Sequence, residues 1–168
     1  AGGRYQRAVA ETFATEGLED QTPVRDSDGT LVGAVNAILE LGRGVSLVGT
    51  VGRAFRSPNL IERFFDGSTP EGSGYQVRNP DLKPETSINM DLGVRYVTSR
   101  ASVEAFTFRN TIHDGIRIEP LGTKVNNVAA YQNTNVDELL FRGVELSGEV
   151  LLGSGFSTGA SYTWQDAA

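Results

Sequence analysis

The feature that most constrains this chain is a polar stretch of about thirty residues between two segments with alternating apolar side chains. The stretch covers residues 56–84, and Pro58 and Pro84 restrict the backbone near its two ends. After it, apolar and polar residues alternate from Thr86 to Val97, a period of two that is typical of a β-strand. Residues 45–55 alternate less strictly and also predict a strand. We therefore expect two long strands joined by a loop that compact soluble domains rarely carry.

The connections along the chain alternate between long and short. About seven strands are expected from the period-two pattern, over residues 2–13, 30–41, 45–55, 86–97, 101–112, 131–152 and 156–164. Short turns are expected at 42–44, 98–100 and 153–155, and long connections at 14–29, 56–84 and 113–130. In an up-and-down sheet this order places every short turn at one rim and every long loop at the other. Membrane barrels have this asymmetry, with short periplasmic turns and long extracellular loops.

The two faces of the expected strands differ in polarity. Side chains expected to face lipid are Ile88, Met90, Leu92, Val94, Phe106, Phe108, Leu146 and Val150. The opposite face carries Asn89, Asp91, Arg95, Arg109, Glu145 and Glu149, as a water-filled barrel interior would. Tyr96, Tyr162 and Trp164 are expected near strand ends, where aromatic girdles lie. A half-buried soluble sheet gives the same alternation, so the faces do not separate the two cases.

Composition narrows the class of protein. The 168 residues include 20 glycines and no cysteine, which favours turns and strands and excludes disulfides. No apolar run approaches the roughly 18 residues of a membrane helix. A net charge of −6 argues against general nucleic-acid binding. No signal peptide is recognisable, and both ends read as cut within a barrel of roughly 22 strands. We therefore interpret residues 1–168 as part of a barrel domain, from which the plug domain and the remaining strands are absent.

Four short sequences resemble the barrel domain of TonB-dependent outer-membrane receptors. Residues 53–60 read RAFRSPNL and residues 79–85 read NPDLKPE, and these are similar to two consecutive elements of that family. Ser57 stands where the family pattern usually has alanine. YQNT at 131–134 and GVE at 143–145 resemble the family's later elements, in the same order. The matching residues, expected to be structural, are Phe55, Pro58, Asn79, Pro80, Leu82, Pro84, Glu85, Asn133, Gly143 and Glu145.

The resemblance implies a transport function at the bacterial cell outer membrane. Such receptors bind a scarce ligand, such as a siderophore–iron complex, cobalamin or a carbohydrate, and import it into the periplasm. Their energy comes from the TonB complex through a plug segment that this chain does not include. The resemblance therefore implies three partners: TonB, the small ligand and outer-membrane lipid. No cofactor is implied.

Arg53, Arg56 and Arg78 are the candidate ligand-binding residues, because they lie at the expected outer rim. They could meet an anionic ligand, although pairing of Arg53 and Arg56 with Asp66, Asp81 or Glu85 is the favoured reading. Residues 79–85 are read as a loop-to-strand junction, because Asn and Pro fix turns. Ser57 and Pro58 could open a short helix, and residues 26–29 read as a plain turn. No catalytic residues and no metal site are recognised, so an enzyme is not expected.

A second function from another class stays open. A soluble or surface-anchored antiparallel β-domain for adhesion or glycan binding could carry the same alternation. Such a domain would not depend on detergent, whereas a barrel wall that exposes apolar side chains to lipid would precipitate without it.

Overall fold

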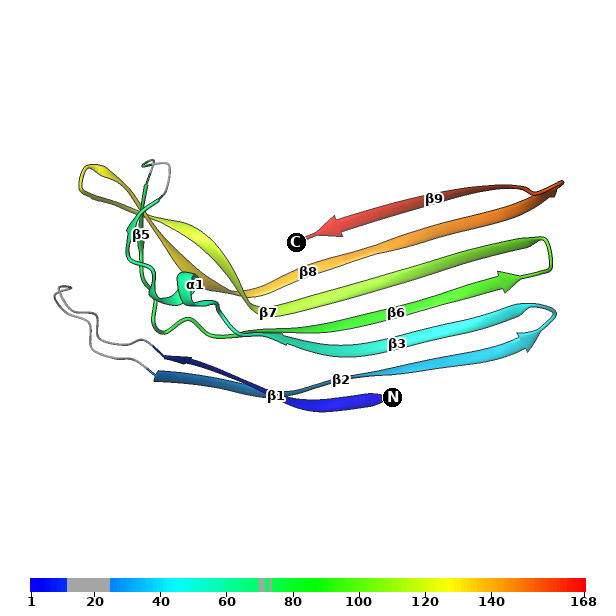
Figure 1. The fold of residues 1–168 in the computed structure, drawn as a ribbon, viewed down its shortest axis with the longest axis horizontal. Coiled ribbons are helices and arrows are strands. Elements are labelled where there is room, and N and C mark those ends of the chain that lie inside the picture. Colours follow the sequence, from blue (N-terminus) through cyan, green and yellow to red (C-terminus); the bar gives the residue numbers. More distant parts are fainter. Residues whose placement is uncertain (12–24, 70–71, 73) are drawn as a thin grey trace.

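The computed structural model describes residues 1–11, 25–69, 72 and 74–168, which form a single β-sheet with one short helix. Seven long strands follow one another in an antiparallel meander (Figure 1). They are β1 Gly2–Glu11, β2 Arg25–Gly42, β3 Val45–Arg56, β6 Glu85–Val97, β7 Ala101–Val125, β8 Val128–Gly153 and β9 Phe156–Ala167. The expected all-β, up-and-down fold is therefore confirmed. The first part of the long connection expected at 14–29 lies outside the described residues.

The turns that join β2 to β3, β6 to β7 and β8 to β9 lie together at one end of the sheet, on the right of Figure 1, and the long connection from β3 to β6 lies at the other end. Two of the short turns need left-handed backbone. Arg43 and Gly44 between β2 and β3 have φ of 53° and 80°, and Ser154 and Gly155 between β8 and β9 have φ of 52° and 83°. Glycine reaches this region without strain, which explains its place in both turns. The position of the long β3–β6 connection, at the end opposite the three short turns, matches the expectation for a membrane barrel wall.

The prediction that residues 113–130 form an irregular connection is wrong. β7 and β8 continue as a paired ribbon to Val125 and Val128, joined by Asn126 and Asn127. These two residues have φ of 50° and 66°, the geometry of a tight hairpin turn for which asparagine is well suited. The prediction of a turn at residues 26–29 is also wrong, because β2 already begins at Arg25 and pairs with β1 there.

The connection from β3 to β6 contains three small elements. Helix α1 covers Leu60–Phe64, and strands β4 Gly67–Ser68 and β5 Gly74–Val77 follow it. Asn59, and not Ser57, is the helix N-cap: its side chain accepts from the Glu62 amide, and the Glu62 carboxylate accepts from the Asn59 amide. This reciprocal pair is a capping box. β5 pairs in parallel with residues 129–132 of β8, so the connection returns to the sheet.

Directly paired residues of neighbouring strands project to the same face, which allows the two faces to be assigned. The outward face carries the exposed apolar side chains, among them Val51, Met90, Leu92, Val103, Leu146, Val150, Tyr162 and Trp164. Phe106 and Phe108 do not belong to it, contrary to the expectation. Their cross-strand partners Gly93 and Asp91 lie on the opposite, polar face. The aromatic rings fill the space above Gly93 and Gly143, since a Cβ at either glycine would meet ring carbons within 2.3 to 2.8 Å. Arg109, which was expected on the polar face, does belong to the outward face, because its cross-strand partner is Met90.

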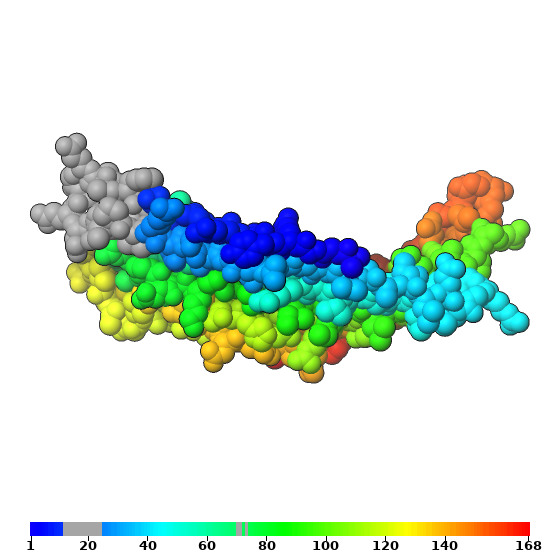
Figure 2. Space-filling view, turned by 90° about the horizontal axis from the view of Figure 1, so that it is seen from below, coloured from blue at the N-terminus to red at the C-terminus, as the bar shows by residue number. Residues whose placement is uncertain are grey.

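The sheet is open within the described part of the chain. β1 pairs only with β2, and β9 pairs only with β8, so each keeps one free edge. Figure 2 views the molecule from its β1 side, where β1 runs uncovered along the edge of a long, bent slab. Among the described residues, Leu82 and Ala130 are the buried hydrophobic core. No helix in the described ranges is long and apolar enough to cross a membrane.

Candidate functional site

The candidate site is a polar cluster at the end of the sheet where the long connections lie. It forms where residues 57–84 fold back against the polar face of the sheet. Helix α1 joins two strands that are not neighbours: Arg63 contacts β2, and the Glu62 carbonyl accepts a hydrogen bond of 2.9 Å from Asn133 Nδ2 on β8. In sheet order, β3, β6 and β7 lie between those two strands. The connection is therefore tied down across the concave, polar side.

Arg63 is the buried centre of this cluster. Its side chain is 1% exposed, and its guanidinium donates to Asp26, to Asp28 at 3.2 Å and to the Leu82 carbonyl at 2.6 Å. Asp26 and Asp28 lie on alternate positions of β2, so both carboxylates point to the same polar face. Burying an arginine is costly unless its charge is paired and hydrogen-bonded, and these contacts supply both.

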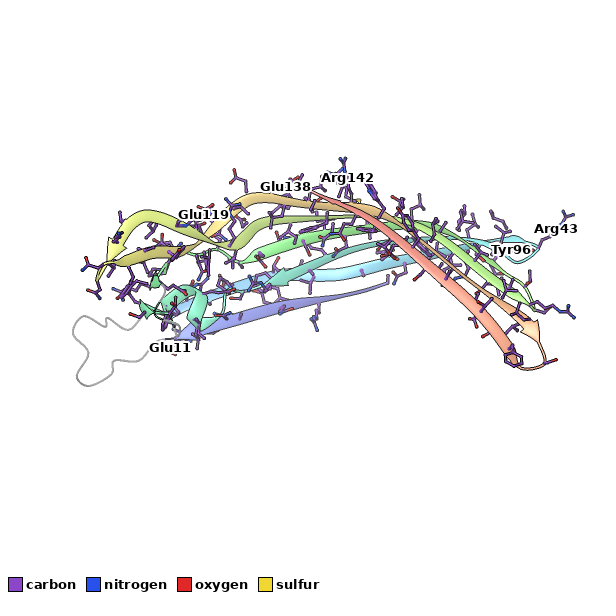
Figure 3. All side chains as sticks on the ribbon, turned by 90° about the horizontal axis from the view of Figure 1, so that it is seen from above. Glu11, Arg43, Tyr96, Glu119, Glu138 and Arg142 are labelled. Carbon is purple, nitrogen blue, oxygen red and sulfur yellow. The ribbon has the colours of Figure 1, made fainter. Side chains whose placement is uncertain are left out.

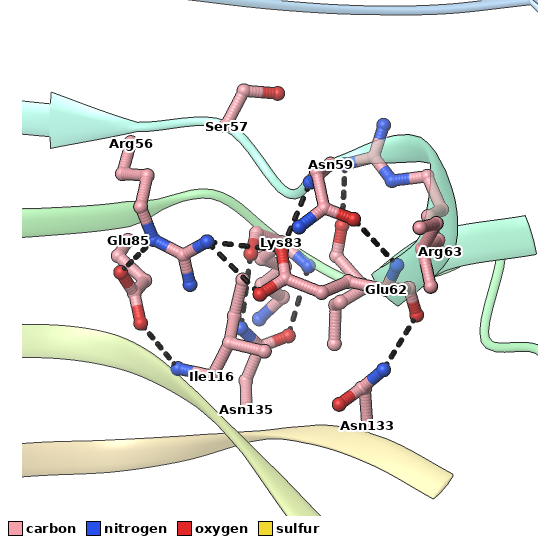
Figure 4. A network of polar contacts seen from close by, with 12 residues as sticks. Arg56, Ser57, Asn59, Glu62, Arg63, Lys83, Glu85, Ile116, Asn133 and Asn135 are labelled. Atoms are coloured by element: carbon pink, nitrogen blue, oxygen red, sulfur yellow. Dashed lines mark hydrogen bonds and ion pairs between the residues drawn. The ribbon is translucent and has the colours of Figure 1, made fainter. Parts of the chain in front are cut away.

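Arg56 is bound by two carboxylates, as Figure 4 shows. Its Nε lies 2.5 Å from Glu85 Oε2, across the β3–β6 pair, and its Nη1 lies 2.9 Å from Glu62 Oε2. The other Glu85 oxygen accepts from the Ile116 amide at 2.6 Å. Glu62 thus links the helix cap to the rim of the sheet, a contact that the sequence reading did not anticipate.

Residues 79–85 are held against β8 by side-chain hydrogen bonds. The Asn79 side chain donates to the Asn133 carbonyl at 2.8 Å, and Leu82 is 1% exposed. Asn135 bonds both backbone groups of Lys83, accepting from its amide at 2.8 Å and donating to its carbonyl at 2.9 Å. The two prolines in this stretch, with these hydrogen bonds, explain a loop that is fixed at its junction with β6.

The three predicted ligand-binding arginines are not brought together. Arg56 is committed to Glu62 and Glu85. Arg53 lies directly opposite Ile88, on the outward face, so it points away from the cluster. Arg78 is 46% exposed and has a loose contact of 3.8 Å with Asp66. Of the three, Arg78 is the one whose charge is available to a ligand near the connection.

Asp66 also contacts Tyr75. The Asp66 carboxylate beside it raises the pKa of the Tyr75 hydroxyl above its usual range.

The other predicted structural residues lie at two places. Phe55 is half-buried on the outward face, opposite Thr86, and Pro58 is buried just before the helix cap. Gly143 and Glu145 lie on the polar face of β8, opposite Phe108 and Phe106. A Cβ at Gly143 would meet the Trp164 carbonyl oxygen at 2.1 Å, so only glycine fits between β7 and β9 there.

A hollow of about 370 Å³ opens beside the cluster, between the start of β2 and the end of the connection. Its walls carry both charges and are formed by Arg25, Asp26, Asp28, Pro80, Asp81, Leu82, Lys83 and Pro84. In the described parts of the chain, no group of three or more His, Cys, Asp or Glu side chains could hold a metal ion. The arrangement can hold a loop and present polar groups at the rim.

The fold and this rim together define a class of protein. An open antiparallel meander with an apolar outward face, a polar inner face, and three short turns at the end opposite the long β3–β6 connection is a segment of an outer-membrane β-barrel wall. The whole chain, residues 1–168, matches the family described as TonB dependent receptor-like, beta-barrel. The chain belongs to this family, whose members are outer-membrane proteins.

Individual relatives agree with the family match. An iron-regulated outer membrane virulence protein of Vibrio cholerae is 32% identical over 124 residues, covering 69% of this chain and 19% of its own length. The vitamin B12 transporter BtuB of Vibrio vulnificus is 25% identical over 94% of this chain and 24% of its own length. The chain thus spans about a quarter or less of these relatives.

Solved structures share the fold. The siderophore receptor PirA from Pseudomonas aeruginosa superposes with a TM-score of 0.73 at 23% identity, covering 87% of this chain and 30% of the receptor. The copper transporter OprC gives a TM-score of 0.72 at 23% identity, covering 97% of this chain and 25% of the transporter. These relatives are receptors and transporters.

Proposed function

We propose that this chain is a wall segment of an outer-membrane receptor that binds a scarce ligand outside the cell and imports it into the periplasm with energy from the TonB complex. The observation that carries the proposal is the family match over residues 1–168. The relatives named for siderophores and vitamin B12 support a small ligand of that class, either a siderophore–iron complex or cobalamin, and a carbohydrate is the third candidate. TonB would act through a plug segment outside this sequence.

Within the receptor, we assign the connection from β3 to β6 to the ligand side. It is anchored by Arg63 and by residues 79–85, while the side chains of Asp66 and Arg78 stay at the surface. Anchoring at both ends keeps the exposed part in place, which lowers the entropy lost when a ligand binds. Arg78 is the proposed ligand contact, and Arg56 acts by positioning Glu62 and Glu85.

The test uses the full-length receptor in a strain that lacks it. Uptake of radiolabelled ferric siderophores, of labelled cobalamin and of labelled carbohydrates is measured with and without a functional TonB. The proposal expects uptake of one of them, and that uptake disappears without TonB. Uptake that does not need TonB, or binding to no ligand of these classes, would refute it. The detergent-free solubility of the receptor tests the alternative of an adhesion or glycan-binding β-domain, which no described feature favours.

Arg78→Ala in the same receptor tests the ligand contact. Its contact with Asp66 is long and solvent-exposed, so its removal costs at most about 1 kcal/mol of stability. We expect normal amounts of receptor in the membrane and weaker ligand binding. Arg117→Ala is the matched control, because Arg117 pairs with Glu119 two residues away on the same strand. Equal binding by both variants and the unaltered receptor would remove Arg78 from the site.

A further inference from the structure

On four strands, the outward face stays uncharged over a similar length counted from the short turns. From each short turn, the outward side chains of β3, β7, β8 and β9 are uncharged until a first charged residue is reached. These first charges are Arg53, Arg109, Arg142 and Asp166. The uncharged run covers about nine residues on each strand, close to the length of a strand that crosses the bilayer core. The four charges therefore mark the outer boundary of the lipid-facing band.

Two of these arginines are direct neighbours. Arg109 and Arg142 are cross-strand partners on β7 and β8, and like charges in this position repel each other. Arg142 is 61% exposed and donates to Asp166 on β9, with nitrogen–oxygen distances of 2.9 and 3.1 Å. Arg109 donates only to the Thr111 hydroxyl, at 3.4 Å. Among the described residues, no carboxylate lies within ion-pair distance of Arg109.

The surroundings on the membrane side are uncharged and mostly apolar. Arg109 lies opposite Met90, which is 48% exposed, and the next outward residues toward the short turns are Thr107 on β7, Val144 on β8 and Trp164 on β9. Figure 3 shows the Arg142 side chain projecting from the convex side of the sheet, away from the concave side. Long basic side chains at such a boundary reach toward lipid headgroups while their stems cover apolar surface. The pair therefore faces the headgroup layer of the outer leaflet.

We propose that Arg109 and Arg142 form a binding site for the phosphate of an anionic lipid in the outer leaflet. The charges fit: two guanidinium groups and the Asp166 carboxylate leave one net positive charge, which equals the charge of one phosphodiester with opposite sign. Arginine suits this ligand because its planar group can give two parallel hydrogen bonds to a phosphate. A bound phosphate also relieves the repulsion between the two arginines.

The experiment places the full-length receptor in nanodiscs of phosphatidylcholine with a minor fraction of phosphatidylglycerol and measures retained phosphatidylglycerol by native mass spectrometry. Arg109→Gln with Arg142→Gln should lower the affinity for it about 30-fold, since each basic residue near a charged membrane surface contributes about five-fold. Arg95→Gln is the matched control, because Arg95 lies on the inner face and pairs with Glu104 at 2.6 Å. Its affinity should equal that of the unaltered receptor.

A variant that is expected to raise the affinity for phosphatidylglycerol separates lipid binding from a loss of folding. Asp166→Asn removes the competing carboxylate and should raise phosphatidylglycerol affinity about five-fold. The proposal fails if the double variant retains phosphatidylglycerol like the unaltered receptor, or if Arg95→Gln loses it equally. It also fails if the double variant changes only the oligomeric state in pure phosphatidylcholine, because the pair would then contact a neighbouring protein.

Discussion

At the scale of single residues, the structure requires an arginine at position 63 and a glycine at position 143 for two different reasons. Arg63 is required for what its side chain contacts, since three acceptors converge on its buried guanidinium. Gly143 is required for what a side chain would displace, since β9 backbone and the Phe108 ring leave no room. The family resemblance identified Gly143, whereas nothing local in the sequence identified Arg63.

Arg63→Ala should release the connection from the sheet. The change leaves Asp28, whose side chain is 12% exposed, without its cationic partner and with the Ser57 hydroxyl as its remaining donor, and breaking such a buried ion pair costs about 3–5 kcal/mol. Hydrogen exchange of the full-length receptor should become faster over residues 59–84 and stay unchanged over β9. Arg78→Ala is the control, and unchanged exchange over 59–84 in Arg63→Ala would contradict the assigned role.

Gly143→Ala should weaken the pairing of β8 with β9. The added Cβ would lie 2.1 Å from the Trp164 carbonyl oxygen and 2.7 Å from the Phe108 ring, so β9 must shift and the ring must move, at a cost of about 1–3 kcal/mol. Gly52→Ala is the control on the same inner face, because the nearest atom there is at an ordinary 3.6 Å. The urea midpoint of the receptor folded in lipid vesicles should fall for Gly143→Ala only. Equal midpoints would show that the sheet absorbs the methyl group.

At the scale of elements, the sequence predicted strands well where they face lipid and poorly beyond it. Residues 86–97 alternate because one face meets apolar lipid and the other meets water, and β6 was predicted to within a residue. The outer part of β7 has water on both sides, so no alternation marks it, and it was mistaken for an irregular loop. The same cause hid the start of β2 at Arg25. β8, in contrast, was predicted from residue 131, three residues after its start at Val128.

Helix α1 is a second case in which local signals were ambiguous. Ser57-Pro58 and Asn59 both suit a helix start, and the choice falls on Asn59 because Glu62 lies three residues later and completes the capping box. The Ser57 hydroxyl instead donates to Asp28 at 2.7 Å. Candidate contacts such as Asn133 with Glu62 join residues 71 positions apart, and no local pattern predicts such pairs.

Asn59→Ala should loosen α1 without unfolding the sheet. Loss of an N-cap side chain costs about 1 kcal/mol, which is large for a helix of five residues. Amide exchange at Glu62 should become faster by roughly five-fold. Ser57→Ala is the matched control and should leave the Glu62 amide protected, whereas faster exchange in Ser57→Ala alone would return the cap to Ser57.

At the scale of the whole molecule, stability depends on which solvent each face meets. Leu92 is 61% exposed in the middle of the outward face of β6, and Thr50 lies on the inner face of β3. Leu92→Arg should destabilise the receptor in lipid vesicles by about 2–4 kcal/mol, the cost of a charge near the bilayer midplane. Thr50→Arg should cost much less. Urea unfolding of the full-length receptor measures both, and equal losses would show that the faces are assigned wrongly.

The ties made by helix α1 have a mechanical consequence for the barrel wall. Arg63 on one side and Asn133 on the other connect β2 to β8 across three intervening strands, as a chord connects two points of an arc. Because these contacts fix the distance between β2 and β8, they also fix the curvature of the sheet at the end that carries the long β3–β6 connection. The rim of short turns has no such cross-connection among the described residues. We therefore expect the barrel wall to bend more easily at the end with the short turns, and any widening of the barrel lumen to begin at that end.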